Sequence, residues 1–177
     1  MASVVKATKA AERILKNAKK VQKYKPCFHY ANTTADGSQI VCDGYRAVIF
    51  KNPLPLEPMP ENLNDCYPDV LRTFPKFKKP VTLELPDAAA LKNYIKAKRA
   101  EDKKALVVFD FGAGLPVVNA TYLLDILEAL PGAVATVERV SGVVYKYGVY
   151  FENAAGDYGL LMPLNAKNDA TRKRTEV

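Results

Sequence analysis

Residues 117–165 read VVNATYLLDILEALPGAVATVERVSGVVYKYGVYFENAAGDYGLLMPLN, and their pattern sets the expected fold. A short apolar strand leads into a helix over 122–130, which either Asn119 or Thr121 can cap. The Pro-Gly pair at 131–132 ends this helix, whose buried face we expect to carry no charge. Three strands are predicted to follow, near 133–140, 143–152 and 158–164. The order strand, helix, strand, strand, strand indicates an α+β fold with an antiparallel sheet.

The length and composition predict one globular domain. The chain has 177 residues, of which 49% are hydrophobic, enough for a sizeable core. No apolar run approaches the ~20 residues of a membrane span, and the N-terminus lacks the apolar segment of a secretory signal. We therefore expect a cytoplasmic protein with no membrane contact. The three cysteines form no CxxC pair and His29 is the only histidine, so we expect no disulfide framework, metal site or cofactor.

The net charge of +7 is concentrated in two segments. Residues 1–25 hold eight basic residues and one acidic residue, and residues 76–104 hold nine basic and four acidic residues. Such clusters favour a polyanionic partner, nucleic acid above all. Lysine-rich helices that are simply well solvated are the alternative, and charge alone does not decide between the two.

The N-terminal segment predicts an amphipathic helix over 4–23, which ends before Pro26. Strands are predicted at 27–31, 39–42 and 45–50, and together with the helix they form a first unit over 4–51. The apolar stripe of the helix comprises Val4, Ala7, Ala11, Ile14, Leu15, Ala18 and Val21.

The middle of the chain separates this unit from the one at 116–165. Residues 52–80 contain seven prolines, which keep the chain extended and oppose helix formation. Their large apolar side chains favour an irregular strap packed on the surface over a disordered tether. A strand over 81–85, a lysine-rich helix over 87–99 and a strand over 105–111 are predicted next.

The two units resemble the half-repeats of the bacterial DNA sliding clamp, the ring-shaped β subunit of the replicative DNA polymerase. The segment VNATYLLDILEAL at 118–130 is similar to the clamp's short helix, and YGLLMPL at 158–164 is similar to its terminal strand. The first unit, with DGYR at 43–46, resembles the clamp's opening unit. The resemblance implies a single clamp-like domain over 1–165, built from two helix-plus-antiparallel-sheet half-repeats and followed by a basic tail at 166–177.

For function, the resemblance implies a non-enzymatic replication accessory, similar to a processivity factor, of the kind that a phage or mobile element encodes. Lysines on the first helix would contact the phosphates of duplex DNA without reading its bases, and binding would depend strongly on salt. The implied DNA-binding residues are Lys6, Lys9, Arg13, Lys16, Lys20 and Lys23. The acids of the helix near 121–130 argue against a symmetric basic lining.

The resemblance also implies a groove for a short hydrophobic peptide of a polymerase or another replication protein. This chain would supply only one wall of the groove, since the neighbouring domain of a clamp supplies the other. The implied groove residues are Val140, Ser141, Met162, Pro163 and Leu164. A single-domain chain could form a ring only as a homo-oligomer.

Two other functions stay open at this point. The chain could be a protein-interaction module with a clamp-type fold and no DNA binding. It could also be a small nucleic-acid-processing enzyme that holds magnesium with Asp43 and Asp110, which lie at the ends of predicted strands. Ordinary turn chemistry accounts for both acids as well, and no nucleotide-binding or hydrolase motif accompanies them.

Overall fold

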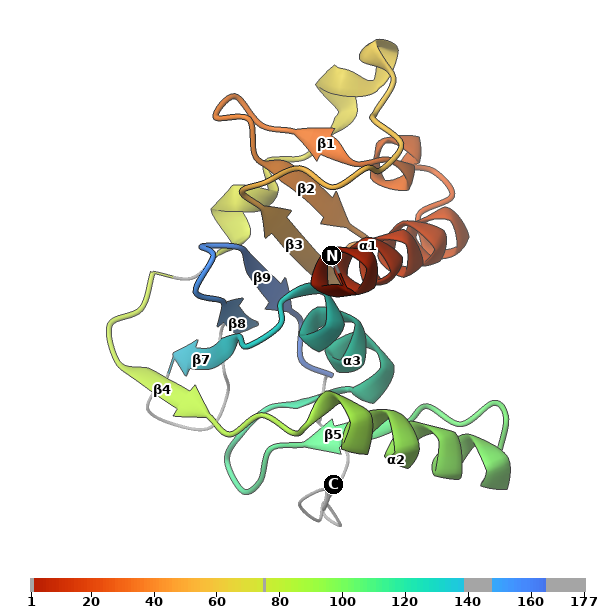
Figure 1. Cartoon of the computed structure of the whole chain (residues 1–177), viewed down its shortest axis with the longest axis vertical. Helices are drawn as coiled ribbons and strands as arrows, with labels where there is room; N and C mark the ends of the chain where they lie inside the picture. Colours follow the sequence, from red (N-terminus) through yellow and green to blue (C-terminus); the bar gives the residue numbers. More distant parts are fainter. Residues whose placement is uncertain (1, 75, 139–147, 165–177) are drawn as a thin grey trace.

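A seven-stranded antiparallel sheet, ordered β1-β2-β3-β9-β8-β7-β4, forms the centre of the molecule (Figure 1). The computed structural model describes residues 2–74, 76–138 and 148–164. A separate two-stranded sheet pairs β5 with β6. The strands are β1 (Asn32–Thr33), β2 (Gln39–Cys42), β3 (Arg46–Phe50), β4 (Pro80–Leu83), β5 (Val108–Asp110), β6 (Val117–Asn119), β7 (Val134–Glu138), β8 (Val149–Glu152) and β9 (Tyr158–Leu161). The expected α+β class is confirmed.

The sheet consists of two three-strand meanders and one edge strand. Helix α1 (Ala2–Val21) precedes the meander β1-β2-β3, and helix α3 (Ala120–Ala129) precedes β7-β8-β9. The last strands of the two meanders, β3 and β9, pair antiparallel, with Arg46 opposite Leu161 and Ile49 opposite Tyr158. Strand β4 lies beside β7 at one edge. The two predicted units are therefore joined in the middle of one continuous sheet.

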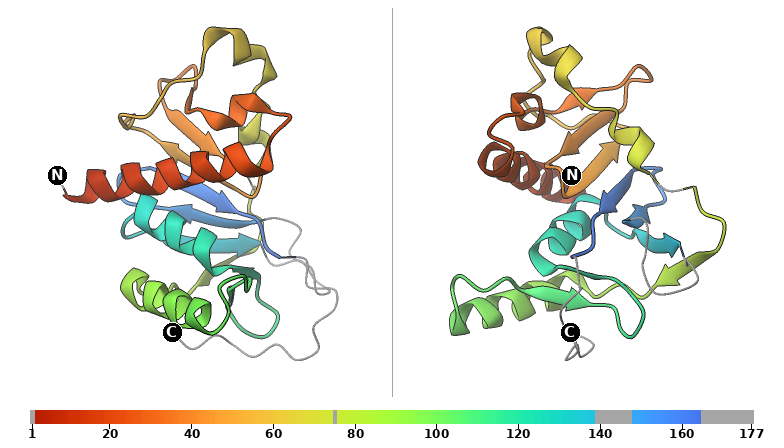
Figure 2. Two further views of the ribbon diagram at one scale, coloured as in Figure 1. Left: turned by 90° about the vertical axis from the view of Figure 1, so that its right-hand side faces the viewer. Right: turned by 180° about the vertical axis from the view of Figure 1, so that it is seen from behind.

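Three helices lie side by side over one face of this sheet, in the order α1, α3, α2 (Figure 2). Helix α2 (Ala88–Glu101) begins at Asp87, whose carboxylate accepts hydrogen bonds from the N–H groups of Ala89 and Ala90. Helix α3 begins at Asn119, whose side chain accepts from Thr121 and Tyr122. Asn119, and not Thr121, is thus the cap. No helix among the described residues combines the length and the apolar character that crossing a bilayer requires.

The core lies between the helices and the sheet. Its largest fully buried side chains include Phe50, Phe151, Leu123 and Ile126. Gly159 of β9 lies where an added Cβ would be 3.0 Å from the Ala47 carbonyl oxygen of β3 and 3.2 Å from Leu130 Cδ1, at the end of α3. A larger residue there would need its neighbours to shift.

On the other face of the sheet, Phe74 and Phe77 pack against strands β8 and β9. Phe74 packs edge-on against Tyr150 and Tyr158, with ring centroids 6.1 and 5.2 Å apart, and Phe77 contacts Tyr150. The segment between β3 and β4 also contains two 3-10 helices, η2 (Glu61–Cys66) and η3 (Val70–Thr73).

Two predictions for the first unit are wrong. Residues 27–31 are not a strand: Pro26–His29 forms a 3-10 helix, η1, because Pro26 fits its first position and the Phe28 N–H bonds to the Lys25 carbonyl at 3.1 Å. Val4 and Val21, assigned to the apolar stripe of the first helix, are 53% and 43% exposed. The N-terminal end of α1 projects beyond the sheet (Figure 2).

Candidate nucleic-acid interface and peptide pocket

The basic residues predicted on the first helix share one exposed side of α1. At about 100° of rotation per residue, the five positions that lie in α1 fall within an arc of about 80°. Each of the six side chains is exposed, and the apolar side of the helix is buried against the core. Lys23 lies in the turn that follows the helix. The structure therefore brings Lys6, Lys9, Lys16 and Lys20 together in one row, which we call the lysine row.

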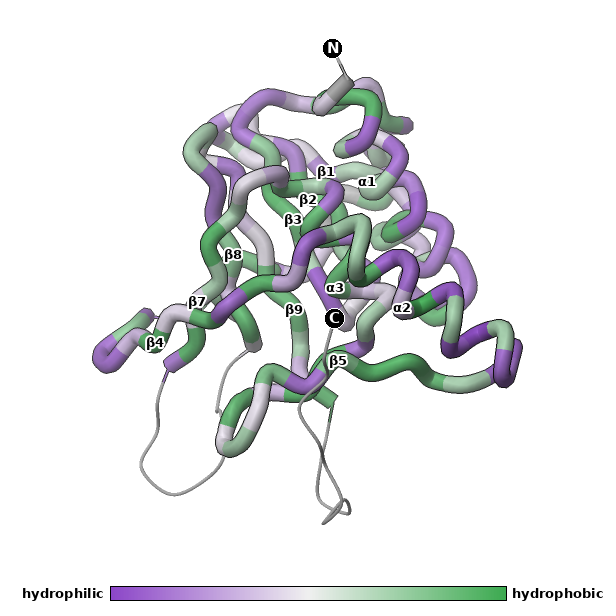
Figure 3. Tube along the Cα trace, turned by 60° about the horizontal axis from the view of Figure 1, so that its bottom comes forward, coloured by the Kyte–Doolittle hydropathy of each residue, from purple (hydrophilic) through white to green (hydrophobic). Residues whose placement is uncertain are grey.

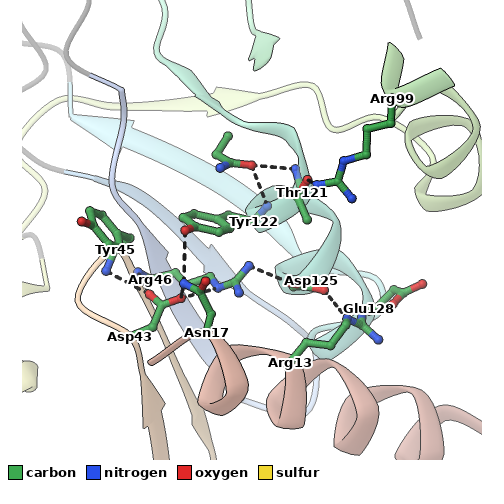
Figure 4. A network of polar contacts seen from close by, with 11 residues as sticks. Arg13, Asn17, Asp43, Tyr45, Arg46, Arg99, Thr121, Tyr122, Asp125 and Glu128 are labelled. Atoms are coloured by element: carbon green, nitrogen blue, oxygen red, sulfur yellow. Dashed lines mark hydrogen bonds and ion pairs between the residues drawn. The ribbon is translucent and has the colours of Figure 1, made fainter. Parts of the chain in front are cut away.

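Arg13 differs from these lysines because it is ion-paired within the molecule. Its Nε lies 2.5 Å from Asp125 Oδ1, and its Nη2 contacts Glu128 (Figure 4). Burial opposes the charged guanidinium, but the hydrogen bonds and charges of Asp125 and Glu128 outweigh it and raise the pKa of Arg13. Arg13 thus neutralises acids of α3 and is less available to a phosphate than the lysines are.

Asp125 is buried at 3% exposure, so the expectation of an uncharged buried face on this helix is wrong. A second partner makes that burial tolerable: Arg46 Nη1 donates to Asp125 Oδ2 at 2.7 Å. Arg46 is itself buried, and its Nε lies 3.2 Å from Asp43 Oδ2. The Arg46 guanidinium also stacks on the Tyr122 ring, with its Cζ 4.1 Å from the ring centroid. The two acids of α3 are therefore ion-paired with arginines from α1 and β3, and Arg46 is shared with Asp43.

Asp43 is part of this network and of the turn between β2 and β3. Its Oδ1 accepts from the backbone N–H groups of Tyr45 and Arg46, each at 3.0 Å, and its Oδ2 accepts from Asn17 at 2.8 Å. Asp110 likewise accepts from the Gly112 N–H at 2.9 Å. The turn interpretation of both acids is confirmed. Within the described residues, no three His, Cys, Asp or Glu side chains gather as a metal-binding group.

Helix α2 adds basic residues on the same face of the sheet, which the sequence reasoning did not assign to a site. Lys92, Lys96 and Arg99 are exposed, and Arg99 Nη2 donates to Thr121 Oγ1 of α3 at 2.9 Å (Figure 4). Lys92 and Lys6 line one hollow of about 650 Å³ between the N-terminal ends of α1 and α2. Figure 3 shows the hydrophilic residues of both helices along this side. The excess of basic residues over 76–104 was the feature of the sequence that could have identified α2 as part of this surface.

Of the residues predicted for the peptide groove, Met162 is the most exposed among those that the structure describes, at 45%. Met162 lines a pocket of about 320 Å³ together with Tyr45, Ala47 and Leu160. Its N–H bonds to the Tyr45 carbonyl at 2.8 Å, which fixes the end of β9 beside the β2–β3 turn. Pro163 and Leu164 are half-buried and lead away toward β6, where the Leu164 N–H bonds to the Val117 carbonyl at 2.7 Å. Val140 and Ser141 lie outside the described residues.

The pocket at Met162 is lined on several sides by residues of this chain. Residues 44–47 and the strap residues Pro68, Val70 and Thr73 form its other sides. These come from this chain, so no neighbouring domain is needed to enclose the pocket. Burial raises the pKa of Cys42, which also lines it, to about 12, and the thiol stays protonated at neutral pH. The pocket therefore offers an apolar surface without a thiolate nucleophile.

No protein-family model, no curated protein and no solved structure matches this chain, so the functional argument rests on the geometry of the two surfaces.

Proposed function

We propose that this protein is a non-enzymatic, clamp-like accessory of DNA replication. It binds the backbone of duplex DNA on its helix face and a short hydrophobic peptide of a replication protein in the Met162 pocket. One observation carries the DNA-binding part. Basic side chains of α1 and α2 flank α3 on one face, and the two acids of α3 are ion-paired within the molecule to Arg13 and Arg46.

The charge of this face supports the proposal. Helix α1 carries six basic residues and only Glu12 as an acid, and α2 carries four basic residues and only Glu101. The ion pairs of Asp125 and Glu128 offset part of the repulsion that α3 would exert on phosphates. Lysines on mobile stems bind phosphates as point charges, so the expected binding is independent of sequence.

The arrangement of elements supports the clamp-like part. Each meander follows a helix, the meanders meet at the β3–β9 pair, and the helices share one face of the sheet. In the clamp resemblance, helices face the DNA and the sheet faces outward. A chain with one such domain would encircle DNA only as a homo-oligomer, and as a monomer it would bind DNA with an open surface.

The proposal predicts that the wild-type protein binds a blunt duplex with an affinity that falls steeply with salt. If the lysine row and α2 contact about four to six phosphates, the slope of log K against log[salt] is about −4 to −5. Fluorescence anisotropy of a labelled duplex, measured over a series of salt concentrations, provides the affinity and the slope. Absence of binding at low salt, or binding that salt does not weaken, would contradict the proposal.

The Met162 pocket favours one second candidate, an interaction module that binds a protein partner and no DNA. Such a module would bind short hydrophobic peptides and show no duplex affinity near physiological salt. The duplex titration therefore separates the two functions.

In both cases Met162→Asp is expected to weaken peptide binding at least about tenfold, because it places a charge in an apolar pocket. Met162 is half-exposed, so thermal unfolding should change little. Leu106→Asp is the matched control, since Leu106 is also exposed and does not line the pocket. Equal effects of the two substitutions on peptide binding would argue against the pocket.

A further inference from the structure

Tyr24 is 98% exposed, the highest value among the exposed large hydrophobic side chains of the described residues. It lies on the turn that follows α1, and this turn is held in place. The Lys25 N–H bonds to the Gln22 carbonyl at 3.0 Å, and Gln22 Nε2 donates to the Asp43 carbonyl at 3.0 Å. A ring nitrogen of His29 also lies 3.2 Å from the Gln22 carbonyl oxygen. The aromatic ring is thus presented to solvent from an anchored turn.

The surroundings of this ring are basic. Lys20 and Lys23 are exposed beside it, and no acidic residue occurs between 13 and 25. The lysine row of α1 leads directly to this turn. Lys25 is directed elsewhere, with its Nζ 5.9 Å from the Phe28 ring centroid. A polyanion that follows α1 toward its C-terminal end would therefore reach Tyr24, whose ring faces are free.

From this geometry we propose that Tyr24 stacks on an unpaired base, so that the preferred ligand is a duplex with a single-stranded overhang beyond the C-terminal end of α1. The inference rests on the proposed function and specifies its ligand. Bases within a duplex are stacked on one another, whereas an unpaired base has a free face for an aromatic side chain. The lysines beside Tyr24 complement the phosphates of the overhang.

The test compares a blunt duplex with the same duplex carrying a single-stranded overhang that contains 2-aminopurine. The wild type is expected to bind the overhang substrate more tightly and to change the fluorescence of the unpaired 2-aminopurine. Tyr24→Ala should lose about tenfold in affinity for the overhang substrate and less than about twofold for the blunt duplex. Tyr24→Phe keeps the ring and should behave like the wild type.

Because Tyr24 is almost fully exposed, Tyr24→Ala should fold normally, and an unchanged thermal midpoint checks this. An unaltered overhang preference in Tyr24→Ala, or an equal loss on both substrates, would overturn the stacking role. In that case wild-type binding to the blunt duplex would leave the proposed function standing. A wild type that binds neither substrate at low salt would reject the proposed function and the stacking role together.

Discussion

Replacing Asp125 with alanine is expected to lower the free energy of unfolding by about 3–5 kcal/mol. Arg46 is almost fully buried, and its Nη1 donates a hydrogen bond of 2.7 Å to Asp125 Oδ2. Removing the carboxylate leaves a buried guanidinium with Asp43 as its remaining acidic partner, and it also removes one of the two acidic partners that Arg13 has on α3. Urea unfolding followed by circular dichroism measures this loss.

Glu128→Ala is the matched control for Asp125→Ala. Glu128 is on the same helix and pairs with the same Arg13, but the pair is more exposed and buries no second arginine. Its removal should therefore lower stability by less than about 1 kcal/mol. If the two substitutions lowered stability equally, the buried network would not be the main link among α1, α3 and β3.

Reversing the charges of Lys9, Lys16 and Lys20 to glutamate is expected to reduce duplex affinity at least about a hundredfold at low salt. The three side chains are exposed and project from one side of α1. The remaining slope of log K against log[salt] should be shallower by about 3, because three phosphate contacts are lost. Arg13 is left unchanged because its reversal would disrupt the ion pairs with α3.

The control for this variant reverses Lys76, Lys78 and Lys79, which carry the same charge and are also exposed. They belong to the segment around Phe77, which packs on the opposite face of the sheet. The control should retain most of the duplex affinity. Equal losses in the two variants would mean that overall charge, and not the helix face, determines binding.

The sequence was informative wherever local patterns determine structure. Apolar periodicity predicted α1, and the helix-to-meander order of both units was correct because capping and turn residues act over a few positions. The segment around Cys27 and Phe28 was misassigned because alternation of apolar residues suggested a strand. The proline at 26 and the need to turn back after α1 favoured a 3-10 helix instead.

The candidate site was predictable only in part. Its lysine row follows from helical spacing, so it could be derived from residues on one helix. The pairing of Arg46 with Asp125 joins residues 79 positions apart, and no local pattern indicates it. No local pattern indicates that Arg99 bonds to Thr121, or that Val70 and Met162 line one pocket, because the two residues of each pair lie on different elements of the fold. Only the tertiary arrangement shows that the acids of α3 are ion-paired with arginines.

The central claim is that duplex DNA binds on the face formed by α1, α3 and α2. An NMR titration of the ¹⁵N-labelled protein with a short blunt duplex at low salt tests this claim most directly. The account predicts chemical-shift changes concentrated in α1 and α2, with little change in β8 and in the segment 67–79. Changes centred on that opposite face, or no changes at all, would contradict it.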